Sequence, residues 1–327
     1  MLAETVEEAG ARLSRAFRKG GACPIRLAHF GAPRAWKRLR VENTVAMDGA
    51  RAAGENTGAG YEGTGRGGIA MDAAQGDVAV VILAAGKGTR MKSTMAKVLH
   101  PIHGKSMVEY VVETARKVAG KDVVVVVGHQ AEKVREVVSA KHPVAFALQE
   151  EQRGTGHAVQ CAMPEVARDA GNVVVLCGDV PLITARSVTR LVERHTEEGA
   201  AVTVLAMEVE EPRGYGRMVT GDGGEVTGIV EEADATDEER KIRTVNAGVY
   251  CVARGFLEES LGQLRDENAQ GELYLTDIVR IAHDEGRKIG MMKVADPREV
   301  IGVNSPAELA KVAALMASGD LKNLDFN

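Results

Sequence analysis

The sequence predicts an α/β protein in which helices cover both faces of a mostly parallel sheet, giving three layers. Two observations lead to this prediction. Short apolar runs without polar alternation, such as VAVVILAA at 78–85, alternate with amphipathic segments of helical period. This is the pattern of strands buried on both faces and joined by crossover helices. Two strand-like runs that flank 221–224 interrupt the alternation and indicate an inserted β-hairpin.

The first part of the pattern alternates regularly between strand and helix. The strands are expected at 78–85, 122–128, 144–149, 172–179 and 201–209. The helices are expected at 107–118, 131–140, 154–163 and 187–199. The first of these helices has the clearest period, because six apolar residues share one of its faces.

After Val209 the order changes. The segment 216–232 reads as two strands around a tight turn. Beyond it we expect a strand at 245–252, a helix at 273–286, a strand at 291–296 and a last helix at 306–319.

The composition is that of an ordinary globular protein and argues against several functional classes. Hydrophobic residues make up 45% of the chain, aromatic residues 3%, and the net charge is −5. A nucleic-acid binder is normally basic, and one that binds single strands uses aromatic rings for stacking. No apolar run has the length of a membrane span. Four cysteines without a C-x-x-C pair suit a reducing compartment. We therefore expect a cytoplasmic protein with no nucleic-acid or membrane partner.

The chain is expected to divide into an extension, residues 1–76, and one domain, residues 77–327. The first 70 residues carry a net charge of +4, against −9 for the remainder. The glycine-rich stretch 49–68 has too few large apolar residues to offset the entropy cost of ordering it. We expect a disordered extension with at most a short helix at 4–19, or translation that begins at Met71.

The segment LAAGKGTRM at 83–91 follows the first predicted strand and suits a phosphate-binding loop. Ligands of open α/β sheets bind at the carboxyl ends of the strands. Gly86 and Gly88 allow backbone N–H groups to approach phosphate oxygens, and Lys87, Arg90 and Lys97 add positive charge. A tight turn with solvated charges explains the glycines alone equally well.

Two better-known glycine motifs fit this segment poorly. A dinucleotide-binding fingerprint requires a third glycine where Met91 stands, and an acidic residue near 128–130, which reads GHQ. A P-loop requires Ser or Thr after Gly-Lys, where Gly88 stands.

Two further segments carry polar residues suited to a nucleotide. Asp179, in GDVPL, follows a predicted buried strand and offers the oxygen ligand that Mg²⁺ prefers; a turn or cap is the alternative. Gln149 offers a donor and an acceptor, as a base edge does, and Gly154 and Thr155 follow it. Thr155 is alternatively a helix cap. We interpret His157 as a packing or surface residue.

Taken in order, the motifs LAAGKGTRM, AKVLHPIHGKSM, LQEEQRGTGHA, CGDVPL, GYGRMV, VTGIVEEADAT, VNAG and GVNSPAEL form a specific set. From Val78 onward the chain resembles the pyrophosphorylase domain of bacterial N-acetylglucosamine-1-phosphate uridyltransferase. The resemblance implies a three-layer, Rossmann-like nucleotidyltransferase fold whose inserted hairpin binds the sugar.

The resemblance also implies a role for each matching position. Catalytic roles fall to Arg90, on the leaving pyrophosphate, and Lys97, on the phosphates. Further nucleotide contacts fall to Leu83, Ala84, Ala85, Gly86, Gln149, Gly154, Thr155 and Gly178. A Mg²⁺ cofactor is implied on Asp179 and Asn304. The amino-sugar contacts fall to Gly216, Glu231 and Asn246.

Three features depart from the family pattern. Ala96 replaces the usual proline before the lysine, which would loosen the approach of Lys97, and Cys177 stands where close relatives often have tyrosine. The hexapeptide-repeat β-helix of the bifunctional relatives does not follow in this sequence, so we expect no acetyltransferase activity and leave the oligomeric state open.

The activity implied is the joining of UTP and N-acetylglucosamine 1-phosphate to UDP-N-acetylglucosamine and pyrophosphate, a step toward peptidoglycan precursors of the cell wall. Two alternatives remain. One is another sugar-1-phosphate nucleotidyltransferase, using glucose 1-phosphate with UTP or dTTP. The other is a catalytically silent nucleotide-binding module.

Overall fold

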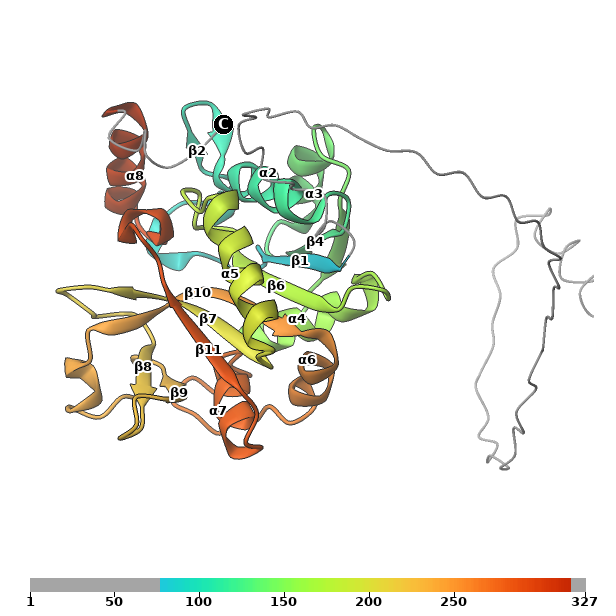
Figure 1. Cartoon of the computed structure of the whole chain (residues 1–327). Coiled ribbons are helices and arrows are strands. Elements are labelled where there is room, and N and C mark those ends of the chain that lie inside the picture. The colour runs from blue at the N-terminus through green and yellow to red at the C-terminus, as the bar shows by residue number, and fades with distance from the viewer. Residues whose placement is uncertain (1–76, 319–327) are drawn as a thin grey trace, which may run out of the picture. The chain divides into compact units, whose positions relative to one another are not determined.

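A mixed sheet of nine strands forms the centre of the protein in a computed structural model that describes residues 77–318 (Figure 1). Seven strands follow the order β11-β7-β10-β6-β1-β4-β5. Their bounds are β1 Val78–Leu83, β4 Val123–Val127, β5 Ala145–Leu148, β6 Asn172–Cys177, β7 Val202–Glu208, β10 Thr244–Ala253 and β11 Ile289–Lys293. Only β10 runs antiparallel to its neighbours along this path. The mostly parallel sheet predicted from the sequence is therefore confirmed.

The remaining two strands of this sheet form the predicted hairpin. β8 (Arg217–Thr220) pairs with β9 (Val226–Val230), and β8 also pairs with β10 through Arg217 and Val245. The turn closes where Gly221 donates its N–H to the Glu225 carbonyl at 2.9 Å. Gly224 there has φ +81°, a conformation that favours glycine. The hairpin thus extends the sheet beside β10.

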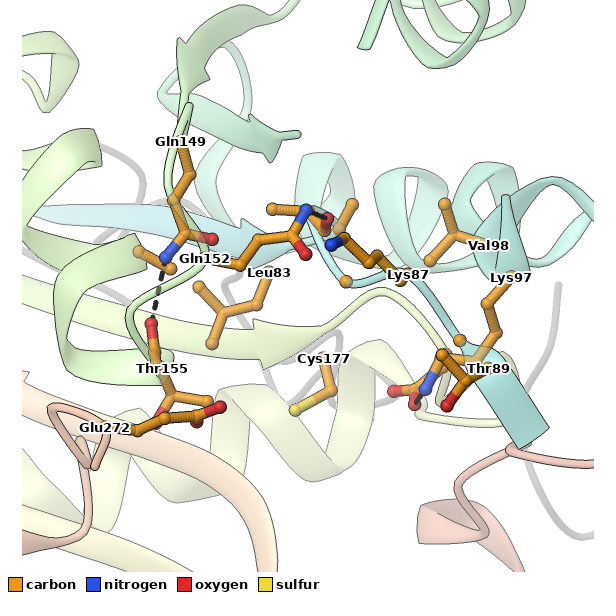
Figure 2. Close-up of a pocket in the computed structure, with 17 residues that line it drawn as sticks. Leu83, Lys87, Thr89, Lys97, Val98, Gln149, Gln152, Thr155, Cys177 and Glu272 are labelled. Carbon is orange, nitrogen blue, oxygen red and sulfur yellow. Dashed lines mark hydrogen bonds and ion pairs between the residues drawn. The ribbon is translucent and has the colours of Figure 1, made fainter. Parts of the chain in front are cut away.

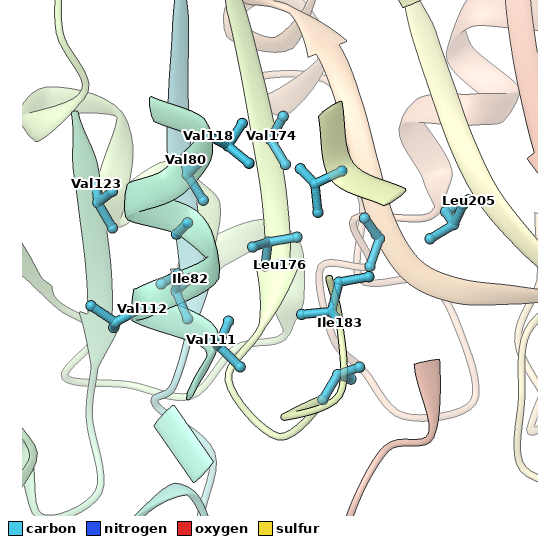
Figure 3. Close-up of a cluster of buried hydrophobic side chains, with 14 of the residues drawn as sticks. Val80, Ile82, Val111, Val112, Val118, Val123, Val174, Leu176, Ile183 and Leu205 are labelled. Atoms are coloured by element: carbon cyan, nitrogen blue, oxygen red, sulfur yellow. The ribbon is translucent and has the colours of Figure 1, made fainter. Parts of the chain in front are cut away.

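Helices pack on both faces of the sheet because alternate strand residues point to opposite sides. Val80 and Ile82 lie in one core with α2 (Met107–Ala119), α3 (Ala131–Ser139) and α5 (Ala185–Glu198), part of which Figure 3 shows. Ala79 and Val81 lie in a second core with α4 (Thr155–Ala162), α6 (Arg254–Leu261) and α7 (Asp277–Asp284). These two cores give the three layers that the sequence predicts.

A smaller cluster joins the last helix to a short hairpin. Val312 of α8 (Pro306–Ser318) packs with Ile102 of β2 (Pro101–Ile102), which pairs with β3 (Lys105–Ser106). The sequence did not predict β2, β3 or α6. No helix among residues 77–318 combines the length and apolarity needed to cross a membrane.

One predicted element begins later than expected. The helix expected at 273–286 starts at Asp277, as α7. Residues 273–276 instead run beside the start of α4, where Leu273 donates its N–H to the Arg153 carbonyl at 2.8 Å and Gly156 donates to the Leu273 carbonyl at 2.7 Å. These non-local bonds outweigh the helical pattern of the segment. The short helix predicted at 4–19 and the extension predicted over 1–76 lie outside the described residues.

Candidate active site

A cleft of about 400 Å³ opens at the carboxyl ends of β1 and β6 (Figure 2). It brings together most of the residues to which the sequence assigned a role in binding the nucleotide or its metal ion. Those that line it are Leu83, Ala84, Ala85, Gly86, Lys97, Gln149, Gly154, Thr155 and Asp179. Lys87, Gly88, Gln152, Cys177 and Glu272 are also among its lining residues.

The glycine loop shapes the floor of this cleft. Gly88 has φ +62°, and a Cβ at this position would overlap with the Cβ of Lys97. A glycine is therefore needed for the Lys97 side chain to pass. Gly86 differs, because nothing lies within 4 Å of the Cβ it would carry. No neighbouring atom therefore excludes a side chain at Gly86, which lines the open cleft.

Lys97, Asp179 and Asn304 converge at one end of the cleft. The Lys97 ammonium is paired with the Asp179 carboxylate and donates to Asn304 Oδ1 at 2.9 Å. Asn304 reaches this point because Val303 donates its N–H to the Asp179 carbonyl at 2.9 Å. Gly178 lies against the loop that follows β1, and its N–H donates to the Leu83 carbonyl at 2.9 Å. Asp179 and Asn304, the two residues assigned to a metal ion, thus both contact the Lys97 ammonium.

The donor set at this point fits a hard cation completed by substrate. Within the described part of the chain, no group of three His, Cys, Asp or Glu residues is placed to hold a metal ion. Mg²⁺ usually binds proteins through one or two carboxylates and takes its other ligands from water and substrate phosphates. Asp179 and Asn304 meet that requirement, whereas they would not form a closed structural site.

Ala96 is held by a contact that a proline could not make. Its backbone has φ −54° and ψ 135°, and its N–H donates to Gln130 Oε1 at 3.0 Å. Gln130 Nε2 donates to the Thr94 carbonyl at 2.5 Å. The Gln130 side chain therefore fixes the loop directly before Lys97. These hydrogen bonds hold the loop at the position where the loss of proline was expected to loosen it.

The residues assigned to the base surround the start of α4. Gly154 has φ +105°, and a Cβ there would lie 2.8 Å from the Leu273 backbone nitrogen, so the close approach requires glycine. The Thr155 hydroxyl accepts the N–H of Leu275 at 3.0 Å. The helix cap considered for Thr155 is absent, since Gly154 is the N-cap residue and no side chain caps α4. Thr155 instead joins the nucleotide side of the cleft to residues 273–276.

The three residues assigned to the sugar gather near the hairpin, and none of them lines the cleft itself. Asn246 donates its N–H to the Gly216 carbonyl at 2.9 Å. A Cβ at Gly216 would lie 3.3 Å from Glu231 Oε2, and Glu231 Oε1 accepts from the Thr276 hydroxyl at 3.1 Å. Burial raises the pKa of Glu231. The group is compact, although its members come from distant parts of the sequence.

Cys177 lies between the sugar group and the cleft. Its thiol donates to the Gly248 carbonyl at 3.4 Å, and the Gly248 N–H donates to Asn246 Oδ1 at 2.9 Å. Burial raises the pKa of Cys177 to about 12. The thiol is thus a neutral neighbour of the sugar group at neutral pH.

Arg90 stands apart from the other assigned residues. It lies on the short 3-10 turn Thr89–Met91, its side chain is exposed, and it is not among the residues that line the cleft. It forms no ion pair with the described residues.

Sequence reasoning missed four residues that shape the site. Gln152 donates to the Ala85 carbonyl at 2.9 Å, and Glu272 lines the cleft. Thr276 contacts Glu231, and Gln130 holds Ala96. Gln152 lay within the motif LQEEQRGTGHA and could have been found there. Thr276 was obscured by the helix predicted at 273–286, and no motif signal pointed to Glu272.

Comparison with known proteins identifies the family. Residues 80–277 match the model of the MobA-like NTP transferase domain. The bifunctional protein GlmU of Pelobacter propionicus is 48% identical over 240 residues, which are 73% of this chain and 52% of that protein. GlmU of Geobacter metallireducens is 51% identical over 236 residues, or 72% and 50%. The chain spans about half the length of the curated relatives it matches.

A solved structure supports the fold alone. It is titled a putative glucose-1-phosphate thymidylyltransferase from Bacillus anthracis, has 19% sequence identity and superposes with a TM-score of 0.57 over 73% of this chain and 94% of that one. This likeness confirms the fold, and the GlmU relatives confirm the resemblance drawn from the ordered motifs. The chain belongs to the MobA-like NTP transferase family and is homologous to the pyrophosphorylase region of GlmU.

Proposed function

We propose that this protein joins UTP to N-acetylglucosamine 1-phosphate, forming UDP-N-acetylglucosamine and pyrophosphate. The observation that carries the proposal is the convergence of Lys97, Asp179 and Asn304 beside the glycine loop. A cation and two oxygen ligands at the end of a nucleotide-sized cleft suit the transfer of a nucleotidyl group. The homology to GlmU supports the choice of substrates.

The reaction requires positioning and charge neutralisation rather than a general base. A phosphate oxygen of the sugar phosphate, already an anion, attacks the α-phosphorus of UTP. The bond from that phosphorus to the bridging oxygen breaks, and its electron pair leaves with pyrophosphate. Positive groups held where this charge develops lower the barrier. We assign Lys97 to the phosphates and Arg90 to the leaving pyrophosphate.

Asp179 and Asn304 would hold Mg²⁺, which when bound supplies charge neutralisation between the two phosphates. Lys97 balances the charge of Asp179 in the described structure, and its flexible ammonium can serve phosphate oxygens instead. Gly178 is packed against the loop after β1, where a Cβ would lie 3.1 Å from the Leu83 carbonyl oxygen, and we assign it to the ribose side from the homology. These assignments bring Lys97, Asp179 and the proposed Mg²⁺ together at one end of the cleft.

The two ends of the substrate would be recognised by different elements. Gln149 and Gly154, with Thr155 behind them, would face uracil, and Leu83, Ala84, Ala85 and Gly86 would line the nucleotide. Gly216, Glu231 and Asn246 would hold the amino-sugar. The half-buried Glu231 carboxylate is suited to accept from sugar hydroxyls, because Thr276 donates to Oε1 and none of the described residues donates to Oε2.

A pyrophosphate-release panel tests the proposal. UTP, dTTP, CTP and ATP are each paired with N-acetylglucosamine 1-phosphate, glucosamine 1-phosphate and glucose 1-phosphate, with and without Mg²⁺. We expect the highest kcat/KM for UTP with N-acetylglucosamine 1-phosphate, and turnover only with Mg²⁺. A preference for glucose 1-phosphate would assign the protein to the alternative sugar nucleotidyltransferases. Nucleotide binding without turnover on any pair would support the silent module.

A further inference from the structure

The amide of Gln149 is held in one orientation at the wall of the cleft. The residue is 3% exposed, and its Nε2 lies 3.0 Å from the Gly154 carbonyl oxygen and 3.3 Å from His157 Nδ1. A carbonyl oxygen only accepts hydrogen bonds, so the NH₂ end of the amide must face it. Figure 2 shows the amide nitrogen bonded on this side and the amide oxygen turned away from it. The orientation of the Gln149 amide, with its NH₂ group toward the Gly154 carbonyl, therefore follows from the rule that a carbonyl oxygen only accepts.

The same contact fixes the proton on His157. Because the Gln149 NH₂ group donates toward Nδ1, Nδ1 must be the acceptor, and the ring proton lies on Nε2. Nε2 lies 3.6 Å from Cys161 Sγ, which can accept it weakly. Burial raises the pKa of Cys161, so its sulfur stays an uncharged thiol. His157 therefore has a contact role that the interpretation as a packing or surface residue did not include.

The amide oxygen is left free for a ligand. None of the described residues donates a hydrogen bond to Gln149 Oε1, although the side chain lines the cleft and is almost fully buried. The oxygen is not one of the buried polar atoms that lack a partner among the described residues, so it can be reached from the cleft, where a donor on a ligand can replace water. Uracil offers a donor at N3, whereas cytosine has an acceptor at that position.

We propose that His157 is a positioning residue for base selection: it holds Gln149 as an acceptor toward the cleft and so favours uracil over cytosine. The proposal deepens the proposed function and rests on its placing the base beside Gln149. If the amide turned over, its NH₂ group would match cytosine N3, but its oxygen would face Gly154 and His157 Nδ1. The Gly154 carbonyl can only accept and so resists the turn, and His157 Nδ1 resists it as long as the ring proton stays on Nε2, beside Cys161 Sγ.

The test measures the affinities of UTP and CTP by titration calorimetry in the presence of Mg²⁺, for the wild type and two variants. His157→Leu removes the acceptor, and His157→Asn retains one because Asn Oδ1 can take the place of Nδ1. We expect His157→Leu to lower the ratio of UTP affinity to CTP affinity about fivefold, the effect of one hydrogen bond. We expect His157→Asn to keep the ratio within about twofold, and Cys161→Ala, which alters only the far side of the ring, to do the same.

Two outcomes overturn the inference. An unchanged ratio in His157→Leu would show that Gly154 alone orients the amide. If His157→Leu and His157→Asn both lowered the affinities for UTP and CTP by the same factor, His157 would have only a structural role. Thermal unfolding of the two variants would reveal such a role independently. This measurement of binding is independent of turnover. A wild type that binds UTP more tightly than CTP but releases no pyrophosphate would contradict the proposed function, whereas the inferred selection of the base by Gln149 and His157 would still hold.

Discussion

The nucleotide side and the sugar side of the site are built in opposite ways. On the nucleotide side, loops that follow parallel strands leave functional atoms unused, as Gln149 Oε1 illustrates. On the sugar side, the hairpin and β10 hold their polar groups through internal bonds. Asn246 Nδ2 donates to the Tyr250 hydroxyl at 2.6 Å, and its Oδ1 accepts from Gly248. We infer that the wall around Gln149 is ready for the base, whereas Asn246 exchanges internal contacts for ligand contacts.

The largest effect is expected from the charges of the nucleotide side. Asp179→Ala removes the carboxylate that pairs with Lys97 and is proposed to hold Mg²⁺. We predict a kcat lower by roughly 10²–10³-fold, the size seen when one stabilising group is removed from a preorganised site. Steady-state rates over a Mg²⁺ titration measure this. Near-normal kcat at saturating Mg²⁺ would reject the metal assignment, and Asp169→Ala, at an exposed position outside the cleft, serves as the control.

Arg90→Ala tests whether an exposed residue belongs to the nucleotide side. The side chain lies outside the cleft, so a role on pyrophosphate requires it to turn inward when substrate is bound. We predict that kcat falls by roughly 10²-fold, while the KM for the sugar phosphate changes less, because the interaction forms mainly as the leaving group departs. Lys92→Ala, an exposed cation next to the same turn, is the matched control. The reverse pattern, with KM affected and kcat retained, would exclude the leaving-group role.

The same contrast explains which parts of the molecule were predictable. Strands such as β1 and β6 are continuous apolar runs, and the glycine loop follows β1 directly, so local sequence indicates both. Gly216, Glu231 and Asn246 lie in three separate segments with no local signature, and only the pairing of β8 with β10 brings them together. Their assignment came from resemblance. Residues 273–276 were misread because their partners, Arg153 and Thr155, are more than a hundred positions away.

Thr155 connects the two sides, and its substitution tests whether they are independent. Thr155→Val keeps the shape of the side chain but removes the acceptor for the buried Leu275 N–H. Thr276, the next residue, contacts Glu231. We predict that the KM for the sugar phosphate rises by about fivefold, the effect of one lost hydrogen bond, and exceeds the change in KM for UTP. Thr155→Ser retains the hydroxyl and should restore both values. A larger change for UTP would mean that the hydroxyl serves the base alone.

The smallest expected effect concerns Gln130, which supports the nucleotide side from outside the cleft. Gln130→Ala removes the hydrogen bonds to the Ala96 N–H and the Thr94 carbonyl, so we predict an increase of about two- to fivefold in the KM for UTP. Ala96 has φ −54°, within the range of proline. In the wild type a proline ring at 96 would collide with Gln130 Oε1, which lies 3.0 Å from the backbone nitrogen. Once Gln130 is alanine, the ring has room and stiffens the chain before Lys97.

A double-mutant cycle separates these effects. Ala96→Pro alone should raise the KM for UTP, whereas Ala96→Pro with Gln130→Ala should return it close to the wild-type value, so the two changes are strongly non-additive. Additive effects would show that Gln130 does not act through residue 96. The positioning of Lys97 would then depend on Gly88, where a side chain would overlap with the lysine itself, and on the ion pair with Asp179. In that case only contacts within the cleft would hold the loop, and no other residue would compensate for the alanine that replaces the family's usual proline at position 96.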